Sequence, residues 1–196
     1  MPAKDMKIGE KIRSLRKAKG LSTADVSEKS GIAESTIYSI EGHLVSPPLG
    51  NLVSLAKVFE VTVGDFFGDS GDSPYCIVRS GDRKTVSRFN STGGESGGYS
   101  YQSLGQQKKN RHMEPFLVTL SPSASPIVEP NQHIGEEILF VLEGEVEIRL
   151  LDQTEILYPG DSIYYDSTMP HVVSCHGDEP ATMLAVIYAK DEMIIL

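Results

Sequence analysis

The spacing of apolar residues changes once along this chain, and the change limits the kinds of structure that it can form. Up to Phe67, apolar residues recur every three or four positions, as on one face of a helix. Later they alternate with polar residues, as on one face of a strand. The stretch 68–74 between the two regions has no apolar side chain. The sequence therefore predicts a multidomain α + β protein with a helical domain over 1–67, a linker over 68–74 and a β domain over 75–196.

Composition supports an ordinary globular protein. Hydrophobic residues make up 39% and charged residues 23% of the 196 residues, which excludes a mainly disordered or fibrous chain. No run of about 18 apolar residues is present, so no membrane partner is expected. No secretory signal opens the chain, and we expect a cytoplasmic protein. Cys76 and Cys175 are far apart and lack a metal-binding spacing, which predicts buried free thiols.

Charge is distributed unevenly between the two regions. Residues 1–67 carry a formal net charge of +1 and residues 68–196 one of −10. A basic element on an acidic chain suits selective contact with a polyanion, because the acidic remainder repels nonspecific phosphate. A solvated helix face explains the same pattern. The cations concerned gather on one segment and are Lys7, Lys11, Arg13, Arg16, Lys17 and Lys19.

Five short helices are expected in the first region. The apolar stripe of Ile8, Ile12 and Leu15 predicts the first helix, and Ser22 followed by Asp25 is a capping-box pattern that begins the second. The others are expected over 33–41, through Leu52, Leu55, Ala56 and Phe59, and in a short turn from Thr62 to Phe67.

The second and third of these helices carry a specific resemblance. The stretch 21–32, with Gly31 at its turn, is followed by Ser-Thr-Ile-Tyr-Ser-Ile-Glu-Gly at 35–42, and together they resemble the phage-repressor-type (XRE-like) helix-turn-helix family over residues 7–67. The resemblance implies that the third helix enters the DNA major groove and that the second lies across the backbone. The residues that it implies at the DNA are Thr23, beside a phosphate, and Glu34, Ser35, Thr36, Tyr38 and Ser39.

Two features depart from that family. Gln usually stands where this chain has Thr23, and no Lys or Arg occurs between Lys29 and Lys57. The recognition helix therefore cannot offer the bidentate arginine contact to guanine. An alternative is a helix-turn-helix kept only for dimerisation or packing.

The second region is expected to be an antiparallel sandwich or barrel. Val146, Ile148 and Leu150 alternate along 145–150, and Glu143-Gly144 joins that strand to an apolar run at 138–142. The Gly- and Ser-rich residues 80–98 are expected to form a flexible connection or arm. Further short strands are expected over 116–120, 154–157, 162–165, 171–174 and 182–188.

Two motifs in this region resemble the cupin family. The stretch 133–146 resembles the first cupin motif, and 158–165 with Pro170-His171 resembles the second, so that the likeness spans roughly residues 110–188. The resemblance implies an antiparallel double-stranded β-helix, or jelly roll.

Metal ligands follow from the same resemblance. Cupins converge two His, one Glu and a later His on a divalent metal, and here Asn131 replaces the first His while His133, Glu137 and His171 remain. Two imidazoles and a carboxylate suit Fe(II) and also hold Zn, Mn or Ni. The alternative is a metal-free pocket. Asn131, with its amide, and Tyr99 and Tyr101, just before the barrel, are candidate ligand-binding residues at the pocket.

The order of the two motif sets resembles a group of bacterial transcription regulators in which a cupin barrel senses a small molecule. It implies double-stranded DNA as a partner, a small-molecule effector, a homodimer and no enzymatic activity. An alternative with the same architecture is a mononuclear iron-dependent oxygenase, such as the epoxidase of fosfomycin biosynthesis. The intact turn pattern and the basic first helix favour the regulator, since an enzyme needs neither.

Overall fold

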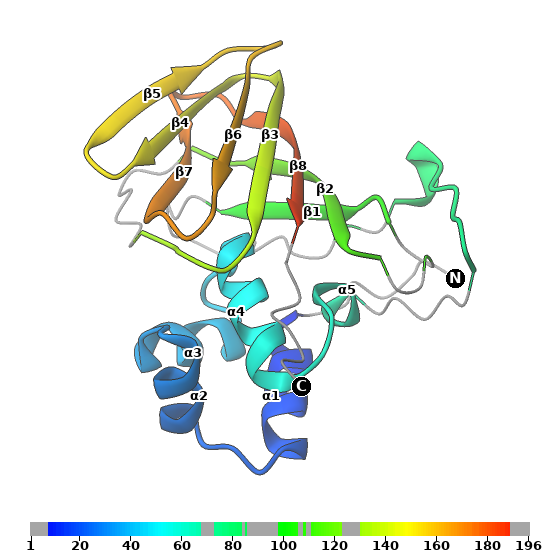
Figure 1. The fold of residues 1–196 in the computed structure, drawn as a ribbon, viewed down its shortest axis with the longest axis vertical. Helices are drawn as coiled ribbons and strands as arrows, with labels where there is room; N and C mark the ends of the chain where they lie inside the picture. Colours follow the sequence, from blue (N-terminus) through cyan, green and yellow to red (C-terminus); the bar gives the residue numbers. More distant parts are fainter. Residues whose placement is uncertain are drawn as a thin grey trace, which may run out of the picture.

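A computed structural model of the chain describes residues 8–67, 73–83, 85, 98–105, 108, 111–122 and 130–188. Helices form the first part and strands the second, so the α + β class is confirmed (Figure 1). The helices are α1 (Ile8–Ala18), α2 (Thr23–Ser30), α3 (Glu34–Glu41), α4 (Leu49–Phe59) and α5 (Val63–Phe66).

Capping residues begin and end α2 at the positions that the sequence predicts. Ser22 caps α2 by accepting from the backbone of Asp25, whose carboxylate accepts from the Ser22 backbone in return. Gly31 follows α2 with φ 74°, a left-handed conformation that costs glycine little. The chain therefore turns tightly between α2 and α3, as the helix-turn-helix resemblance implies.

The second part consists of two antiparallel sheets. The larger has the strand order β1-β2-β8-β3-β6 and the smaller the order β5-β4-β7. The strands are β1 (Tyr99–Ser103), β2 (Met113–Leu120), β3 (Glu136–Glu143), β4 (Glu145–Leu150), β5 (Gln153–Leu157), β6 (Ser162–Asp166), β7 (His171–His176) and β8 (Ala181–Tyr188). The cupin-type jelly roll is thus confirmed. The sequence did not predict β1 as a strand, because Tyr-Ser-Tyr-Gln-Ser carries no long apolar pattern.

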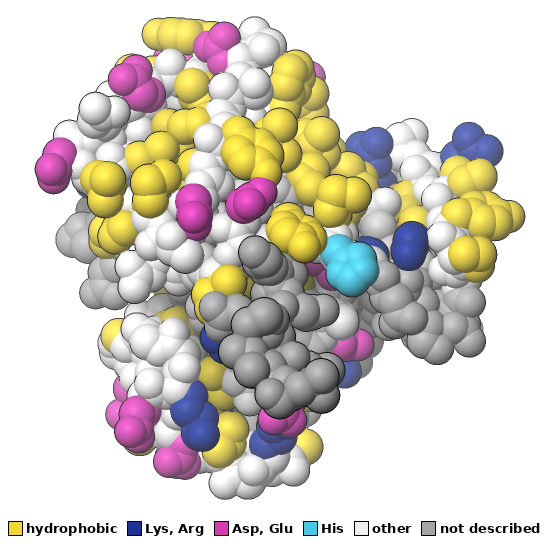
Figure 2. Space-filling view, in the orientation of Figure 1, with side chains coloured by type: hydrophobic (Ala, Val, Ile, Leu, Met, Phe, Trp, Pro, Cys, Tyr) yellow, Lys and Arg dark blue, Asp and Glu magenta, His cyan; other side chains and the backbone are white. Residues whose placement is uncertain are grey.

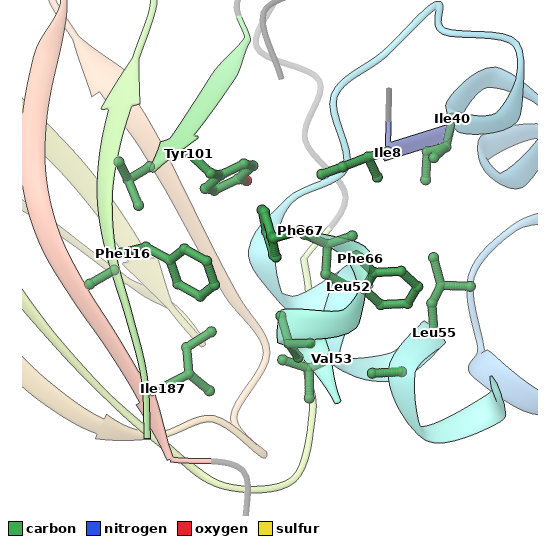
Figure 3. Packing of buried hydrophobic residues seen from close by; sticks show 14 of the residues in the cluster. Ile8, Ile40, Leu52, Val53, Leu55, Phe66, Phe67, Tyr101, Phe116 and Ile187 are labelled. Atoms are coloured by element: carbon green, nitrogen blue, oxygen red, sulfur yellow. The ribbon is translucent and has the colours of Figure 1, made fainter. Parts of the chain in front are cut away.

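The helical and β parts share one apolar core. Phe67, just after α5, packs against Phe116 of β2 with ring centroids 5.0 Å apart, and Tyr101 of β1 lies 6.3 Å from the same ring. Figure 3 shows these rings in the region where the sheet, with Ile187, faces α4, with Val53. The two parts are therefore packed against each other through a shared apolar core.

Parts of the predicted linker and arm lie within the described residues. Ser73 forms a parallel bridge with Lys108, and Thr85 pairs with Gln102 of β1. The connection between them includes a short 3-10 turn, η1 (Ser80–Asp82). Residues 68–72 and 86–97, which complete the predicted linker and most of the arm, lie outside the described part.

Cys76 and Cys175 are free, and each is half-buried rather than fully buried as expected. None of the described helices is both long and apolar enough to span a membrane.

Candidate ligand pocket and DNA-binding helix

The side chains of His133, Glu137 and His171 meet inside the β domain. Strand alternation turns them inward, and a backbone bridge between two segments of the chain brings them together. Glu137 points inward from β3, opposite Tyr165 of β6 in the strand register. Asn131 and His171 exchange two backbone hydrogen bonds, of 2.8 and 2.9 Å, which bring the start of β7 beside the segment before β3. His133, two residues after Asn131, thereby reaches the same interior.

The predicted metal triad is assembled. Ligand atoms of His133, Glu137 and His171 all lie within 4.8 Å of one another, and the three residues are buried. His133 Nε2 lies 2.6 Å from Glu137 Oε1, and the Tyr165 hydroxyl donates to Glu137 Oε2 over 2.5 Å. A carboxylate and two imidazoles facing one point have the donor chemistry of a divalent metal site.

Backbone carbonyls orient both imidazoles. His171 Nδ1 lies 2.8 Å from the Met169 carbonyl oxygen, and His133 Nδ1 lies 3.4 Å from that of Ile134. In His171 a proton on Nδ1 satisfies the Met169 carbonyl and leaves Nε2 directed into the site, whereas Nε2 of His133 donates to the Glu137 carboxylate in this structure. Such supporting contacts are typical of metal-binding histidines.

The surroundings hold Glu137 as a carboxylate and His171 as a neutral imidazole, the states that a metal needs in these two ligands. Burial by itself raises the pKa of Glu137, but the hydrogen bond and charge of His133 and the Tyr165 hydroxyl outweigh it and hold that pKa below its ordinary value. Burial lowers the pKa of His171 despite the nearby carboxylate. Burial likewise raises the pKa of Tyr165, so its phenol stays protonated and keeps donating to Glu137. The triad therefore offers an anionic carboxylate and a neutral His171 at neutral pH.

A small pocket, with a cavity volume of about 40 Å³, opens beside the triad. Tyr99 and Tyr101 form one wall, with parallel rings 6.0 Å apart at the centroids. Asn131 also lines it, so the structure brings together all three residues expected to meet a ligand. The remaining lining comes from Glu137, Val118, Leu139, His171, Val173, Met183 and Ala185 of the β domain and from Pro48, Leu49 and Gly50 of the helical domain.

The helical domain therefore closes part of this pocket. Gly50, in the first turn of α4, lies so close that an added Cβ would stand 2.9 Å from His133 Cδ2 and 3.1 Å from Asn131 Cβ. The Tyr101 hydroxyl donates to the Pro47 carbonyl oxygen over 2.9 Å, and both residues are buried. In the sequence, Pro47 and Pro48 indicate only the start of a helix, because no periodicity predicts a contact between domains.

The face of α3 expected at DNA is open at Tyr38, which is 59% exposed, and at Ser35. Glu34, Thr36 and Ser39 are half-buried, and the Ser39 hydroxyl donates to the Ser35 carbonyl of the same helix. The structure thus leaves Tyr38 as the one large side chain exposed among the expected DNA-contacting residues.

Thr23 differs from its expected place beside a phosphate. It is buried, and its hydroxyl donates to Glu34 Oε1 over 2.7 Å, joining the start of α2 to the start of α3. Two of the expected DNA-contacting residues are therefore paired with each other, and Thr23 positions α3 rather than facing solvent.

Several cations of the basic segment already form ion pairs within the fold. Arg16 binds both carboxylate oxygens of Glu41, at 2.6 and 2.7 Å, and Arg13 donates to the same residue. Lys19 pairs with Glu60. Lys11 and Lys17 make no ion pair within the part of the chain that the structure describes. The basic segment is consequently less available to a polyanion than its composition suggests.

Comparison with known proteins agrees with both parts. Residues 12–66 match the family model described as helix-turn-helix, and residues 116–187 match the one described as cupin domain. The HTH-type transcriptional regulator PuuR of Escherichia coli (strain K12) is 29% identical over 168 residues, which cover 85% of this chain and 86% of PuuR. The HTH-type transcriptional regulator SinR of Bacillus licheniformis is 33% identical over 69 residues, 35% of this chain and 62% of SinR.

Two solved structures share the fold. An HTH_3 family transcriptional regulator from Vibrio cholerae superposes with a TM-score of 0.61 at 22% identity, over 94% of this chain and 96% of that one. The Fe(II) form of HppE superposes with a TM-score of 0.50 at 22% identity, over 95% of this chain and all of that one. At these identities the likeness concerns the fold alone.

The molecule is thus an XRE-like helix-turn-helix DNA-binding domain fused to a small cupin domain. In this combination of domains it is similar to the HTH-type transcriptional regulator PuuR over most of both chains.

Proposed function

We propose that this regulator binds operator DNA through α3 and that a divalent metal, a small-molecule effector or both, bound in the cupin pocket, control its affinity. It acts in the cytoplasm as a homodimer, whose two recognition helices lie about 34 Å apart and read a near-palindrome. One observation carries the proposal: residues 48–50, which line the pocket, follow α3 through a short connection.

That connection supplies a route for control. From Glu41 at the end of α3, residues 42–48 lead directly into α4, whose first turn touches the site at Gly50. A ligand that fills the pocket must contact this wall or displace it. If the ligand binds more tightly to one placement of the helical domain, it shifts the population toward that placement. Operator affinity then depends on ligand concentration.

The triad supports a metal in this role. His133 Nε2, His171 Nε2 and a Glu137 oxygen would hold Fe(II), Zn, Mn or Ni and leave positions open toward the pocket. A bound metal supplies Lewis acidity for oxygen or nitrogen atoms of an effector. Asn131 and Tyr99 lie where they would contact that effector. Tyr165 fixes the Glu137 carboxylate, and the Met169 carbonyl fixes His171.

The DNA contact is proposed to come from the open face of α3. Tyr38 and Ser35 face outward, and Thr36 and Ser39 flank them. Glu34 lies only at the edge of the proposed DNA contact, because its carboxylate already accepts a hydrogen bond from the Thr23 hydroxyl. Since α3 has no cation, sequence reading depends on hydrogen bonds and on apolar contact with thymine methyl groups. Lys11 and Lys17 of α1 are the cations best placed to contribute a salt-dependent phosphate term.

Genomic footprinting with the full chain, followed by fluorescence anisotropy on the recovered sites, tests the proposal. Affinity should fall steeply with salt, and it should change when Fe(II), Zn, Mn or Ni is added. Glu137→Ala, which removes the anionic ligand, should bind DNA but lose the metal response and the metal itself. Asn131→Ala is the matched control and should keep the metal. Absence of any specific site at low salt would overturn the regulator proposal.

The oxygenase is a second candidate because the triad is of the 2-His-1-carboxylate type. In that case His133, Glu137 and His171 hold Fe(II), which supplies the oxygen chemistry, while the pocket walls orient a substrate. Oxygen uptake by the Fe(II)-loaded protein with small carboxylates and phosphonates, absent in Glu137→Ala, would favour it. A regulator whose DNA affinity responds to metal without oxygen uptake would exclude it.

A further inference from the structure

The outer face of the larger sheet is apolar, although the inner face already packs into the core. Along β3, Glu137, Leu139 and Val141 point inward, while Ile138 and Phe140 point outward and remain exposed. An antiparallel sheet normally has one apolar and one polar face. The run Ile-Leu-Phe-Val-Leu at 138–142 is continuous rather than alternating, a pattern typical of a strand covered on both sides.

Register extends this surface across neighbouring strands. Tyr164 of β6 lies opposite Ile138, and on the other side of β3 lie Val186 and Leu184 of β8. Figure 2 shows hydrophobic side chains gathered over the strands labelled β3 and β6 in Figure 1. We call this surface the outer apolar face. Its large exposed members are Met113, Ile138, Phe140, Leu142, Tyr164 and Tyr188.

The smaller sheet provides an internal comparison. The outward residues of β4 are Glu145, Glu147 and Arg149, and His176 of β7 lies within 4.0 Å of the first two. The central strand of that sheet therefore turns charged side chains outward, although Ile156 and Val172 of its neighbours share that face. The central strand of the larger sheet instead turns Ile138 and Phe140 outward, so an apolar outer strand is not a general property of this fold.

Charge lies at the two ends of the outer apolar face along β3. Glu136 and Asp166 lie opposite each other at one end, where the Tyr164 hydroxyl donates to the Glu136 carboxylate, and exposed Glu143 lies at the other end, opposite Thr182 of β8. No Lys or Arg lies among the described residues of the face. Because the chain has a net charge of −9, contact between two copies through most of its surface is repulsive, and this face is a place where they can meet without burying charge.

The size of the face suits a dimer. Its six large members are between 37% and 65% exposed. With about 200 Å² for each complete side chain, they present roughly 600 Å² of mainly apolar surface, at the upper limit for the largest patch on a monomer. A stable interface buries about 800 Å² per partner, of which somewhat over half is apolar. The two quantities agree.

We propose that a second copy of this chain docks on the outer apolar face, face against face about a twofold axis. A twofold contact pairs one patch with itself, so no other partner is needed. The same surface would form the homodimer of the proposed function. The interface rests on that function only in one respect, because operator binding gives the chain a reason to dimerise. Phe140, near the middle of the face, is the residue whose replacement should matter most.

Sedimentation velocity of the full chain over a concentration series tests the interface. Wild type should sediment as a dimer. Phe140→Glu should raise the dimer dissociation constant by at least about 30-fold, the ratio expected when an interface hot spot is lost. Thr154→Glu, an exposed change on β5 of the smaller sheet, is the matched control and should remain dimeric. Tyr164→Lys repeats the test at a more exposed position, in case Phe140→Glu fails to fold.

Each outcome decides the proposal. A monomeric wild type, or dimers of unchanged affinity in folded Phe140→Glu and Tyr164→Lys, overturns it. Deletion of residues 189–196, which lie outside the described part, examines the other occupant: if that deletion creates rather than preserves self-association, the chain's own end covers the face and a second copy does not. A monomer that still binds a specific operator overturns only the interface, whereas a dimer without specific DNA binding overturns only the proposed regulator.

Discussion

Tyr101, on the first strand of the cupin domain, donates its hydroxyl to the carbonyl oxygen of Pro47, at the end of the connection that leaves the recognition helix. The contact is 2.9 Å long and buried. A buried carbonyl that loses its donor is costly, so this bond ties the wall of the ligand pocket to the DNA-binding domain. It gives the proposed coupling between ligand and DNA a particular point of attachment.

Tyr101→Phe should weaken that coupling. Loss of the hydroxyl leaves the Pro47 carbonyl without its donor, and the free energy of unfolding should fall by about 1–3 kcal/mol. The change in operator affinity on adding metal should shrink as well. Tyr99→Phe is the control, because the Tyr99 hydroxyl donates to Val173 within the cupin domain. It should cost stability but keep the metal response. An unaltered response in Tyr101→Phe would mean that control takes another route.

Gly50→Ala should disturb the metal site from the helical domain. Helix propensity alone favours alanine by about 1 kcal/mol, but the new Cβ would stand 2.9 Å from His133 Cδ2. The imidazole or α4 must therefore move. We expect metal affinity, measured by titration, to fall by roughly 10- to 100-fold, as when a supporting contact of a metal ligand is lost. Gly81→Ala, with no atom near its added Cβ, should match wild type. Equal affinities in both variants would show that the domain contact is dispensable.

Tyr38→Ala should change which DNA sequences are bound while leaving thermal unfolding unchanged, since this side chain is mostly exposed. Selection of binding sites from a random DNA pool measures the change, and one altered base preference should be worth about 1–3 kcal/mol. Ser14→Ala on α1 is the control, because its hydroxyl binds the Glu10 carbonyl of its own helix and lies outside the proposed DNA-contacting set. Identical preferences in Tyr38→Ala and wild type would show that Tyr38 reads no base.

Glu41→Gln should destabilise the helical domain in a pH-dependent way. Burial alone raises the pKa of Glu41, but hydrogen bonds and charges from Arg16 and Arg13 outweigh it and hold that pKa below its ordinary value. A lowered carboxyl pKa stabilises the fold above the unfolded pKa of about 4.3, and this stabilisation is lost as pH falls through the folded pKa. At pH 7 the variant should lose on the order of 3 kcal/mol.

Urea unfolding at pH 7 and at steps down to about pH 3 measures this effect. The gap between wild type and Glu41→Gln should narrow below about pH 4.3. Glu60→Gln is the control: its partner is Lys19, but its side chain is 82% exposed, so little stability should change. A gap for Glu41→Gln that stays constant with pH would contradict a role for its charge.

Local patterns predicted the elements well where they report local physics. The Ser22 and Asp25 capping box and the left-handed Gly31 both occur as expected, because each depends on neighbours within a few residues. The triad of His133, Glu137 and His171 was predicted by resemblance, and the structure assembles it. Tyr165 was missed as its support, although alternation along β6 and its pairing with Glu137 could have indicated it.

The sequence by itself determined the two kinds of secondary structure, their order and the donor set of the site, since periodicity, caps and motif spacing act over short distances. Tertiary structure alone decided that Thr23 pairs with Glu34, that Arg16 is committed to Glu41 and that Gly50 closes the cupin pocket. These contacts join residues whose separation along the chain leaves no periodic trace. Buried polar groups need hydrogen-bond partners, and close packing leaves few voids. The packing of the helices against one another decides the first two contacts, and the packing of the two domains decides the third.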